Sequence, residues 1–371
     1  MNKWLQLVAT FLVAACSAKP EPALLDETRF DTVVDEKPVS LVTIRNKHLA
    51  LQATNFGGRV VSLFVPDRNG EYKDVVLGRN TIDEYVHYAS DRFLGSCVGP
   101  VANRITNASF TIDGVTYHLE TNHGGKGTLH GGFKGLDSIV WEIENATKNS
   151  ITFHYIHKDG EGGFPGNLDI RMKYSLTKDD SFKIEYEATT DKTRPVNISN
   201  HPYFNFSQGG TIEDYVLYIN GDKITGIDGL DVMDPPIDIK GTPMDYRTPH
   251  KIGDAFESDF EQLLRGRGGF DHNYCINLSS EKLTEAASVY DPSSGIFLEV
   301  FSDQPGLQVY SGQYMSGKTE GKYGTKLEKY GSITLETQNW PDAPNKPDFP
   351  DPYLKPGEKY THTCIYRFST K

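Results

Sequence analysis

The sequence predicts an all-β fold, a large antiparallel β-sandwich with few short helices. In residues 168–176 and again in residues 182–188, apolar side chains alternate strictly with polar ones, which is the period of a half-buried strand. The chain has 20 Tyr and 19 Phe against 5 Met, together with 35 Gly and 20 Pro, a balance that favours strands and turns. Strand patterns never alternate with long helical ones, which argues against a doubly wound α/β fold.

The individual elements follow from the same patterns. Residues 178–180 join the two alternating runs as a hairpin turn, and Asp113-Gly114 closes another hairpin over residues 109–120. Further strands are expected at residues 39–45, 50–56, 60–65, 139–144, 150–157, 215–219, 296–301, 308–310, 332–337 and 360–368. Helices are expected only at residues 81–89 and 252–265. No linker or repeat divides this region, so we expect a single domain.

The N-terminus has the pattern of an export signal. Lys3 precedes an apolar run over residues 4–15, which is too short to span a bilayer, and small residues then precede Cys16. This pattern predicts a lipoprotein signal peptide over residues 1–15, lipidation of Cys16, a tether or N-terminal segment over residues 16–37, and a β-sandwich domain over residues 38–371. The expected location is the periplasmic or cell-surface side of a bacterial membrane, with the lipid as the only anchor. A conventional signal peptide is the alternative.

Charge and cysteine content restrict the possible partners. With 38 Lys and Arg against 50 Asp and Glu, the net charge of −12 argues against a nucleic-acid partner. Cys97, Cys275 and Cys364 match no metal-binding spacing, and Cys364 alternates with aromatic residues as a core residue would. We therefore expect no essential disulfide. No interface stripe is evident, which favours a monomer.

Five polar stretches at expected strand ends could carry chemistry. Each one places an ionisable or amide side chain beside glycine, proline or aromatic residues, which let a ligand approach the backbone or stack on a ring. The five stretches are residues 99–105, 128–132, 200–205, 269–274 and 335–345. Taken singly, each is weak, because a lone histidine in a β protein is more often structural and a lone glutamate more often solvated. The set is informative because it combines two histidines, an aspartate, a glutamate and an arginine.

In order and approximate spacing, these stretches resemble those of the galactose mutarotase (aldose 1-epimerase) family. The resemblance extends from Val39 to Phe368 and includes the loop at residues 161–166. It implies a supersandwich fold of that family, an isomerase that interconverts the α and β anomers of an aldohexose such as galactose or glucose, and a monosaccharide as the partner. The resemblance also implies that His201 is the general acid, Glu336 the general base and His130 an assisting histidine. The implied sugar-binding residues are Asn103, Arg104, Asp271 and Gln308.

The chemistry of anomer exchange agrees with these residue types. A base must remove the proton of the C1 hydroxyl while an acid protonates the ring oxygen. A carboxylate, with a reference pKa of ~4.3, and a histidine, with a reference pKa of ~6.5, suit the two tasks. No metal or other cofactor is required. Asp342, Asp348 and Asp351 could form a Ca²⁺ site, but a solvated acidic loop is the favoured interpretation of these residues. Trp340 or Phe204 would cover the apolar face of the sugar.

Three alternatives compete with this interpretation. A glycoside hydrolase could use Asp271 and Glu336 as its carboxylate pair, but the two histidines would then have no task. A sugar-phosphate epimerase would need an arginine cluster, and Arg265 and Arg267 are a poorly placed pair for it. A non-catalytic carbohydrate-binding sandwich would need neither an acid nor a base.

Overall fold

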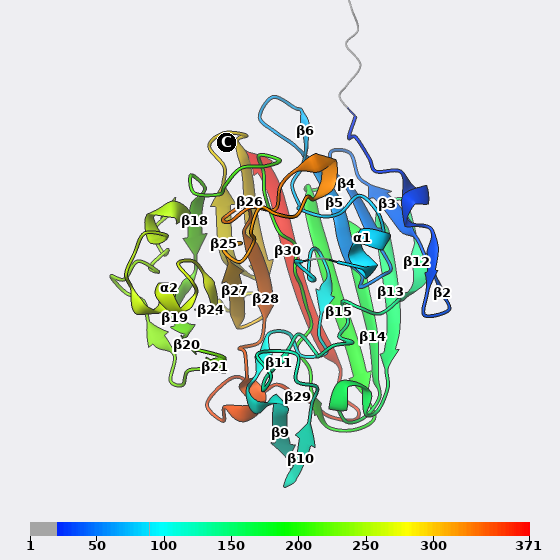
Figure 1. Ribbon diagram of the computed structural model, residues 1–371, viewed down its shortest axis with the longest axis vertical. Coiled ribbons are helices and arrows are strands. Elements are labelled where there is room, and N and C mark those ends of the chain that lie inside the picture. Colours follow the sequence, from blue (N-terminus) through cyan, green and yellow to red (C-terminus); the bar gives the residue numbers. More distant parts are fainter. Residues whose placement is uncertain (1–20, 89) are drawn as a thin grey trace, which may run out of the picture.

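The computed structural model describes residues 21–88 and 90–371 of the chain. The expected signal peptide and Cys16 lie outside the described residues. Within the described part, no helix has both the length and the apolar character needed to cross a membrane. Strands are the main regular structure of the described chain, and they lie in two layers (Figure 1).

One layer is a nine-stranded antiparallel sheet. Its central strands are long and have a neighbouring strand on each side, and β14 pairs with β15 along its whole length. In spatial order its strands are β12 (Glu142–Ala146), β13 (Ser150–His157), β14 (Leu168–Leu176), β15 (Ser181–Thr190), β30 (Tyr360–Thr370), β26 (Ile296–Ser302), β25 (Thr284–Tyr290), β18 (Val216–Ile219) and β23 (His250–Lys251).

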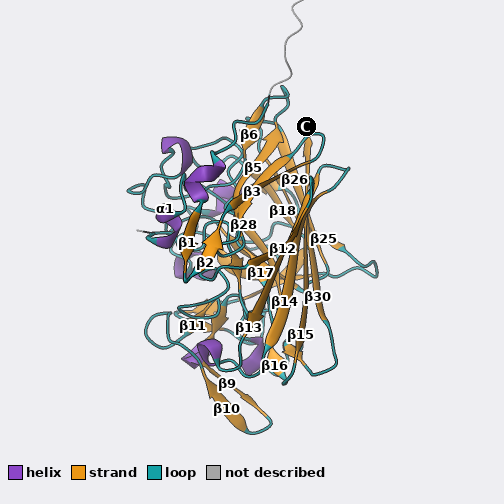
Figure 2. Ribbon diagram, turned by 90° about the vertical axis from the view of Figure 1, so that its right-hand side faces the viewer, coloured by secondary structure: helices purple, strands orange, loops and turns teal. Residues whose placement is uncertain are grey.

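The facing layer contains a five-stranded and a four-stranded sheet. Figure 2 shows β28 on one side of the molecule and the long strands β14, β15 and β30 on the other. The five-stranded sheet consists of β22 (Ile237–Asp238), β19 (Gly221–Thr225), β24 (Asp271–Ile276), β27 (Gly306–Tyr310) and β28 (Thr334–Gln338). The four-stranded sheet consists of β3 (Leu41–Arg45), β4 (Ala50–Thr54), β5 (Arg59–Pro66) and β6 (Tyr72–Asp74).

Short elements complete the fold. The two-stranded pairs are β1 (Thr32–Val34) with β2 (Lys37–Val39), β7 (Cys97–Val98) with β17 (Ser199–Asn200), β8 (Arg104–Ile105) with β11 (Thr128–Leu129), β9 (Ser109–Ile112) with β10 (Val115–His118), β16 (Arg194–Pro195) with β29 (Tyr353–Leu354), and β20 (Ile227–Asp228) with β21 (Asp231–Val232). The α-helices are α1 (Asp83–Val86) and α2 (Glu261–Arg265), and single 3₁₀ turns occur at Glu27–Phe30, Thr106–Ala108, Glu161–Gly163, Ile252–Ala255, Lys322–Gly324 and Ala343–Asn345.

The core lies between the two layers and confirms the predicted sandwich. Tyr174 of β14 and Tyr366 of β30 are fully buried, and their hydroxyls cross to the facing layer. The Tyr366 hydroxyl donates to the carbonyl of Leu335 at 2.7 Å, and that of Tyr174 donates to the carbonyl of Gly58 at 2.6 Å. Buried tyrosines are stable where the hydroxyl finds a partner, so these contacts hold the layers in register.

The structure differs from the sequence expectations at the N-terminal segment and at the helices. Phe30 and Leu25 are buried in a core cluster, and β1 and β2 form a hairpin, so the packed domain begins well before residue 38. The expected helix over residues 81–89 is reduced to the short α1. The one expected over residues 252–265 breaks into a 3₁₀ turn and α2. In the second case, residues 258–260 between the two pieces have no regular secondary structure.

A buried ion pair anchors the long loop between β27 and β28. The Lys322 ammonium lies 2.5 Å from the Asp74 carboxylate and also donates to the carbonyl of Val61 and the hydroxyl of Ser62. Both charged side chains are almost completely buried, and burial lowers the pKa of Lys322. The pair joins this loop, which also carries Tyr314, to the four-stranded sheet.

We expect Lys322→Met to destabilise the protein by about 3–5 kcal/mol, because the buried Asp74 carboxylate would lose its counter-charge. The double variant Lys322→Met/Asp74→Asn should recover much of this loss, since no uncompensated charge remains. Urea unfolding followed by tryptophan fluorescence measures both values. Equal stability of the single variant and the wild type would contradict the prediction.

Candidate active site

One half of the site is built on the five-stranded sheet. In its register Gln308 of β27 lies opposite Glu336 of β28, and Asp271 at the start of β24 lies opposite Tyr310. Residues directly opposite one another, and residues two apart on one strand, point to the same face of a sheet. Asp271, Gln308, Tyr310 and Glu336 therefore share the face that lines the cavity described below.

The other half comes from two loops that hold each other. The backbone N–H of Asn103 donates to Nδ1 of His130 at 3.1 Å, and the backbone N–H of His130 donates to the carbonyl of Asn103 at 2.9 Å. Both residues have positive φ, 63° and 50°, a conformation that costs a non-glycine residue ~1–3 kcal/mol and that often occurs at functional sites. At Gly131, a Cβ would lie 2.0 Å from the carbonyl oxygen of Gly99, so only glycine allows these loops to approach.

His201 follows β17 and is fixed by the backbone of a third segment. Its N–H donates to the carbonyl of Ser96 at 2.8 Å, and its carbonyl accepts from the N–H of Gly95 at 3.0 Å. Its imidazole stacks on Tyr203 with ring centroids 4.7 Å apart. The ring is thus held from its backbone and from one face.

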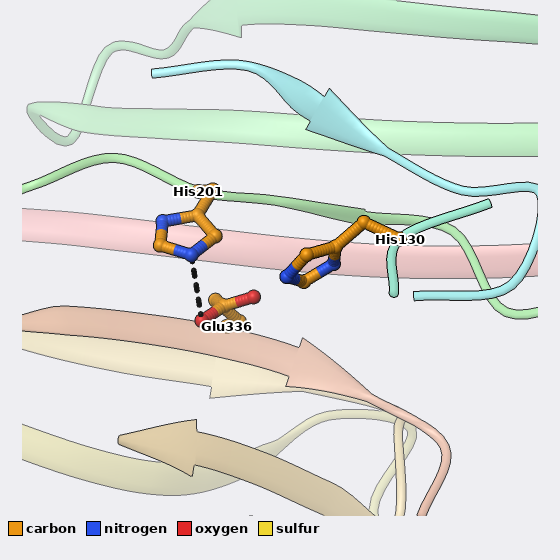
Figure 3. Close-up of side chains that lie close together, drawn as sticks. All are labelled: His130, His201 and Glu336. Atoms are coloured by element: carbon orange, nitrogen blue, oxygen red, sulfur yellow. Dashed lines mark ion pairs between the residues drawn. The ribbon is translucent and has the colours of Figure 1, made fainter. Parts of the chain in front are cut away.

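His130, His201 and Glu336 meet at the centre of the cavity. Nε2 of His201 lies 3.4 Å from Oε1 of Glu336, and the two imidazole centroids are 5.6 Å apart (Figure 3). The potential ligand atoms of all three residues lie within 4.8 Å of one another, a spacing that a metal ion could also use. Because Nδ1 of His130 accepts a backbone N–H, its neutral ring carries the proton on Nε2. That nitrogen is therefore a hydrogen-bond donor, and the trio suits proton transfer better than metal ligation.

Burial determines the protonation of the trio. It raises the pKa of Glu336 well above its ordinary value, with a further increase from the Asp271 charge. It lowers the pKa of His201 to about 4 and that of His130 well below the ordinary value. Each group alone is thus favoured in its neutral form, and Glu336 and His201 lie close enough to titrate as a coupled pair.

A second charged group borders the trio. Nη2 of Arg104 lies 2.6 Å from Oδ2 of Asp271, while Nε2 of Gln308 donates to Oδ1 of Asp271 at 2.8 Å. Burial opposes the charge on Arg104, but the neighbouring Asp271 outweighs it and raises the pKa of Arg104 above its ordinary value. Both carboxylate oxygens of Asp271 therefore already accept hydrogen bonds, one from Arg104 and one from Gln308.

These residues line an open cavity of about 640 Å³, a volume in the usual range for small-molecule sites. Several buried polar atoms around it have no hydrogen-bond partner within the described protein, namely Nε of Arg104, Nδ1 of His201, Oε1 of Gln308 and Oε2 of Glu336. Buried polar groups are almost always paired, so such atoms in one cavity indicate a site for a polar ligand. All seven residues predicted as catalytic or sugar-binding line this cavity.

The aromatic residues of the cavity differ from those expected. Phe204 is fully buried in the core, and Trp340 packs on Phe349, so neither lines the cavity. Instead the aromatic lining consists of Phe93, Tyr203, Tyr310 and Tyr314. Tyr203 lies in the polar stretch at residues 200–205 and Tyr310 in the strand expected at residues 308–310, next to Gln308, whereas no sequence signal indicates Phe93 or the nearby His123.

Arg265 and Arg267, which the sequence analysis judged poorly placed for binding a sugar phosphate, do line the cavity. Arg265 is paired with Asp228 and Glu261, which neutralise its charge. Arg267 lies over the ring of Tyr314, with its guanidinium carbon 5.1 Å from the centroid. The mouth of the cavity thus mixes both signs of charge.

The residues considered for Ca²⁺ do not form a cluster. Asp342 accepts from the N–H of Thr106 and from the side chain of Asn345, and Asp351 accepts from the N–H of Tyr353. Among the described residues, the group spaced for a metal ion is the trio itself. Cys364, predicted as a core residue, is a buried free thiol, and so are Cys97 and Cys275.

A second cavity of about 630 Å³ lies beside β2, β12 and β13. Its main polar groups are already satisfied within the protein. The side chain of Asn55 donates to the carbonyls of Pro38 and Trp141, and the hydroxyl of Tyr155 donates to Glu161. Its His154–Glu142 pair, 3.5 Å apart, differs from the trio because Glu142 is largely exposed and the other ring nitrogen of His154 is bound to Asp169.

Comparison with known proteins agrees with this site. A family model described as aldose 1-epimerase matches residues 40–367. The chain belongs to the aldose 1-epimerase family. It is 37% identical over 346 residues to a galactose mutarotase of Rattus norvegicus, covering 91% of this chain and 98% of that one. It is 33% identical over 339 residues to an aldose 1-epimerase of Escherichia coli K12, covering 90% and 96%.

Solved structures of the aldose 1-epimerase family share the fold. An aldose epimerase homologue from C. elegans superposes with a TM-score of 0.83 at 28% identity, covering 90% of this chain and 99% of that one. A galactose 1-epimerase from Lactobacillus acidophilus gives a TM-score of 0.79 at 26% identity, covering 91% and 97%.

Proposed function

We propose that the protein is an aldose 1-epimerase that interconverts the α and β anomers of an aldohexose such as galactose or glucose. The observation that carries the proposal is the meeting of Glu336 and His201, whose reactive atoms lie 3.4 Å apart in a cavity with unpaired buried polar atoms. Because Asp271 is bound to Arg104 and Gln308, it is a poor second carboxylate for a glycoside hydrolase. A non-catalytic binding protein would not need the buried acid–base pair.

The pair can open the sugar ring without a cofactor. In its ion-pair form Glu336 accepts the proton of the C1 hydroxyl, the O–H electrons form the aldehyde C=O, and the C1–O5 bond breaks. The electrons of that bond take the proton from Nε2 of His201, so O5 becomes a hydroxyl. Glu336 is then protonated and His201 neutral, which is the state that burial favours for both groups. Rotation about C1–C2 and reversal of these steps give the other anomer.

The remaining residues would bind and orient the sugar. Arg104 and Asn103 present donors and an acceptor from one loop, and Asp271 and Gln308 present acceptors from the sheet. His130, with its proton on Nε2, would donate to a sugar oxygen. Charge-assisted hydrogen bonds of this kind are the stronger ones in proteins.

Polarimetry on freshly dissolved α-D-galactose and α-D-glucose tests the proposed function. The purified protein should accelerate the approach to the equilibrium rotation without changing the final value. A parallel assay with aryl galactosides and glucosides should release no aglycone. If equilibration proceeds at the uncatalysed rate with these and other aldoses, the proposal fails.

The acid limb of the pH profile should lie unusually low. A second proton on the Glu336–His201 pair would prevent the reaction, and burial lowers the pKa of His201 from 6.5 to about 4. We therefore expect kcat/KM to remain high as the pH falls through 6.5 and to decline closer to 4. Initial rates in buffers from pH 4 to 8, corrected for the uncatalysed rate, measure this. A decline centred on 6.5 would contradict the prediction.

We also propose that the mature protein is an exported lipoprotein held by lipid on Cys16. The apolar run after Lys3 and the small residues before Cys16 support this. A chain of myristoyl length alone binds membranes only marginally, but several chains, at ~0.8 kcal/mol per buried CH₂, anchor stably. The enzyme would then equilibrate sugars outside the cytoplasm.

The anchor proposal is tested by fractionating a bacterial host that expresses the full chain or its Cys16→Ala variant. The wild type should enter the membrane fraction and carry lipid on Cys16 by mass spectrometry, while the variant should not. Equal solubility of both forms without lipid would refute the anchor and leave the proposed activity unaffected.

A further inference from the structure

The segment at residues 92–96 connects the two histidine-bearing parts of the site. On one side, the backbones of Gly95 and Ser96 are hydrogen bonded to that of His201. On the other side, the Arg92 guanidinium makes five hydrogen bonds to the loop that follows His130. Two of them go to Asp137, at 2.7 and 2.9 Å. The segment is therefore fixed relative to both histidines.

A second arginine, Arg59, also fixes the segment. Nη1 of the buried Arg59 donates to the carbonyl of Arg92 at 2.9 Å and to that of Leu94 at 3.0 Å. The carbonyl between them, that of Phe93, accepts from the N–H of Ser96. The backbone on both sides of Phe93 is thus bonded, and its side chain has little freedom to move away from the cavity.

The Phe93 ring lies against both histidines. Its centroid is 4.6 Å from that of His130, with the planes tilted by 58°, and 6.0 Å from that of His201, with the planes 20° apart. The side chain is only partly exposed, and it lines the cavity. Among the described residues, Phe93 is the one other ring that contacts both imidazoles.

We propose that Phe93 is a positioning residue, which fixes the relative orientation of His130 and His201 and keeps water away from both rings. The role given to the histidines rests on the proposed function, but the contact itself does not. An aromatic ring in this place contributes through packing, since it has no polar atom to exchange protons or bind a hydroxyl.

The water-exclusion part of the proposal has a measurable electrostatic consequence. His201 is surrounded by Glu336 on β28, Asp271 on β24, Tyr310 on β27, and by Arg59, His130 and Tyr203. The largest cause of its lowered pKa is nevertheless burial. Removal of the Phe93 ring would admit water to one side, and the pKa of His201 would rise toward its ordinary value.

The test compares Phe93→Ala and Phe93→Leu with a control, Phe133→Ala. Phe133 is 59% exposed, lies in the loop held by Arg92, and does not line the cavity. The histidine resonances of the sugar-free protein are titrated by NMR and assigned with His130→Asn and His201→Asn variants. In Phe93→Ala the pKa values of both histidines should rise, in Phe93→Leu they should rise less, and in Phe133→Ala they should not change.

The kinetic arm measures mutarotation of the same variants. In Phe93→Ala we expect kcat to fall by about 10- to 100-fold with a smaller change in KM, because the reacting groups are misplaced while the sugar contacts remain. Phe93→Leu, which retains bulk, should recover part of the loss. An unchanged kcat with a raised KM would make Phe93 a sugar-stacking wall and overturn the proposal. Unchanged histidine pKa values in a folded Phe93→Ala protein would do the same.

The two arms separate this inference from the proposed activity. If the wild type proves inactive on every aldose, the NMR titration still decides whether Phe93 shields the histidines. If Phe93→Ala does not fold, as judged by circular dichroism, the Leu variant decides both arms.

Discussion

Glu336→Gln should reduce kcat for mutarotation by about 10²–10⁴-fold, the usual contribution of a group that transfers a proton in the transition state. The amide has almost the same shape but cannot accept the C1 hydroxyl proton. Burial raises the pKa of the carboxyl well above its ordinary value, so replacing it with a neutral amide should not destabilise the fold. The thermal midpoint should therefore remain equal to or above that of the wild type.

Initial rates by polarimetry and a thermal melt of the same sample measure the two halves of this result. Glu187→Gln is a matched control, because Glu187 is an exposed carboxylate on the nine-stranded sheet that pairs with Lys359. It should have wild-type kcat. If Glu336→Gln also retains wild-type kcat, another group must be the base.

His201→Asn should lower kcat by a similar factor, because proton donation to the ring oxygen occurs only in the transition state. KM should change less, since asparagine can still hydrogen bond the sugar. The parallel variant His130→Asn should raise KM more and lower kcat less. Its backbone should tolerate the change, because asparagine adopts the positive φ of 50° found at His130 more easily than most residues.

Steady-state kinetics of both histidine variants over a range of sugar concentrations separates the two roles. If the kcat effects of the two variants come out reversed, the acid role belongs to His130. An undisturbed circular dichroism spectrum of each variant is the control that local loss of structure is not the cause.

The sheet half of the site was predictable because it follows from strand register. Gln308 and Glu336 lie in segments that the sequence predicts as strands, and such residues converge once the strands pair. Asp271 was predicted only as part of a polar stretch, and the strand β24 that carries it was not predicted. The alternation from residue 168 to 176 likewise predicted β14 to the residue. A period-two pattern is contained within its own segment, so the strand can be predicted without knowledge of the rest of the chain.

The loop half could be predicted as residues but not as contacts. The motifs around Asn103, His130 and His201 indicated the polar groups, whereas the mutual hydrogen bonds of Asn103 and His130 depend on two loops brought together by tertiary packing. Phe93 lies in no motif and reaches the site through the bonds of Arg92 and Arg59. The hairpin of β1 and β2 was missed because its strands are only three residues long and mostly exposed, so they carry no alternating apolar pattern.

The reactivity of the three buried thiols can be used to measure local unfolding of the protein. Cys97 lies in β7, Cys275 in β24 of the five-stranded sheet, and Cys364 in β30 of the nine-stranded sheet. Burial raises the pKa of Cys275 and Cys364 to about 12 and that of Cys97 well above its ordinary value, so each thiol reacts only when its surroundings open. In a Cys16→Ala chain, the rates at which a thiol reagent modifies the three sites would give the opening free energy of each part separately. Sugar binding should slow modification of Cys97 more than that of Cys364, because the strand of Cys97, β7, pairs with β17, which directly precedes His201.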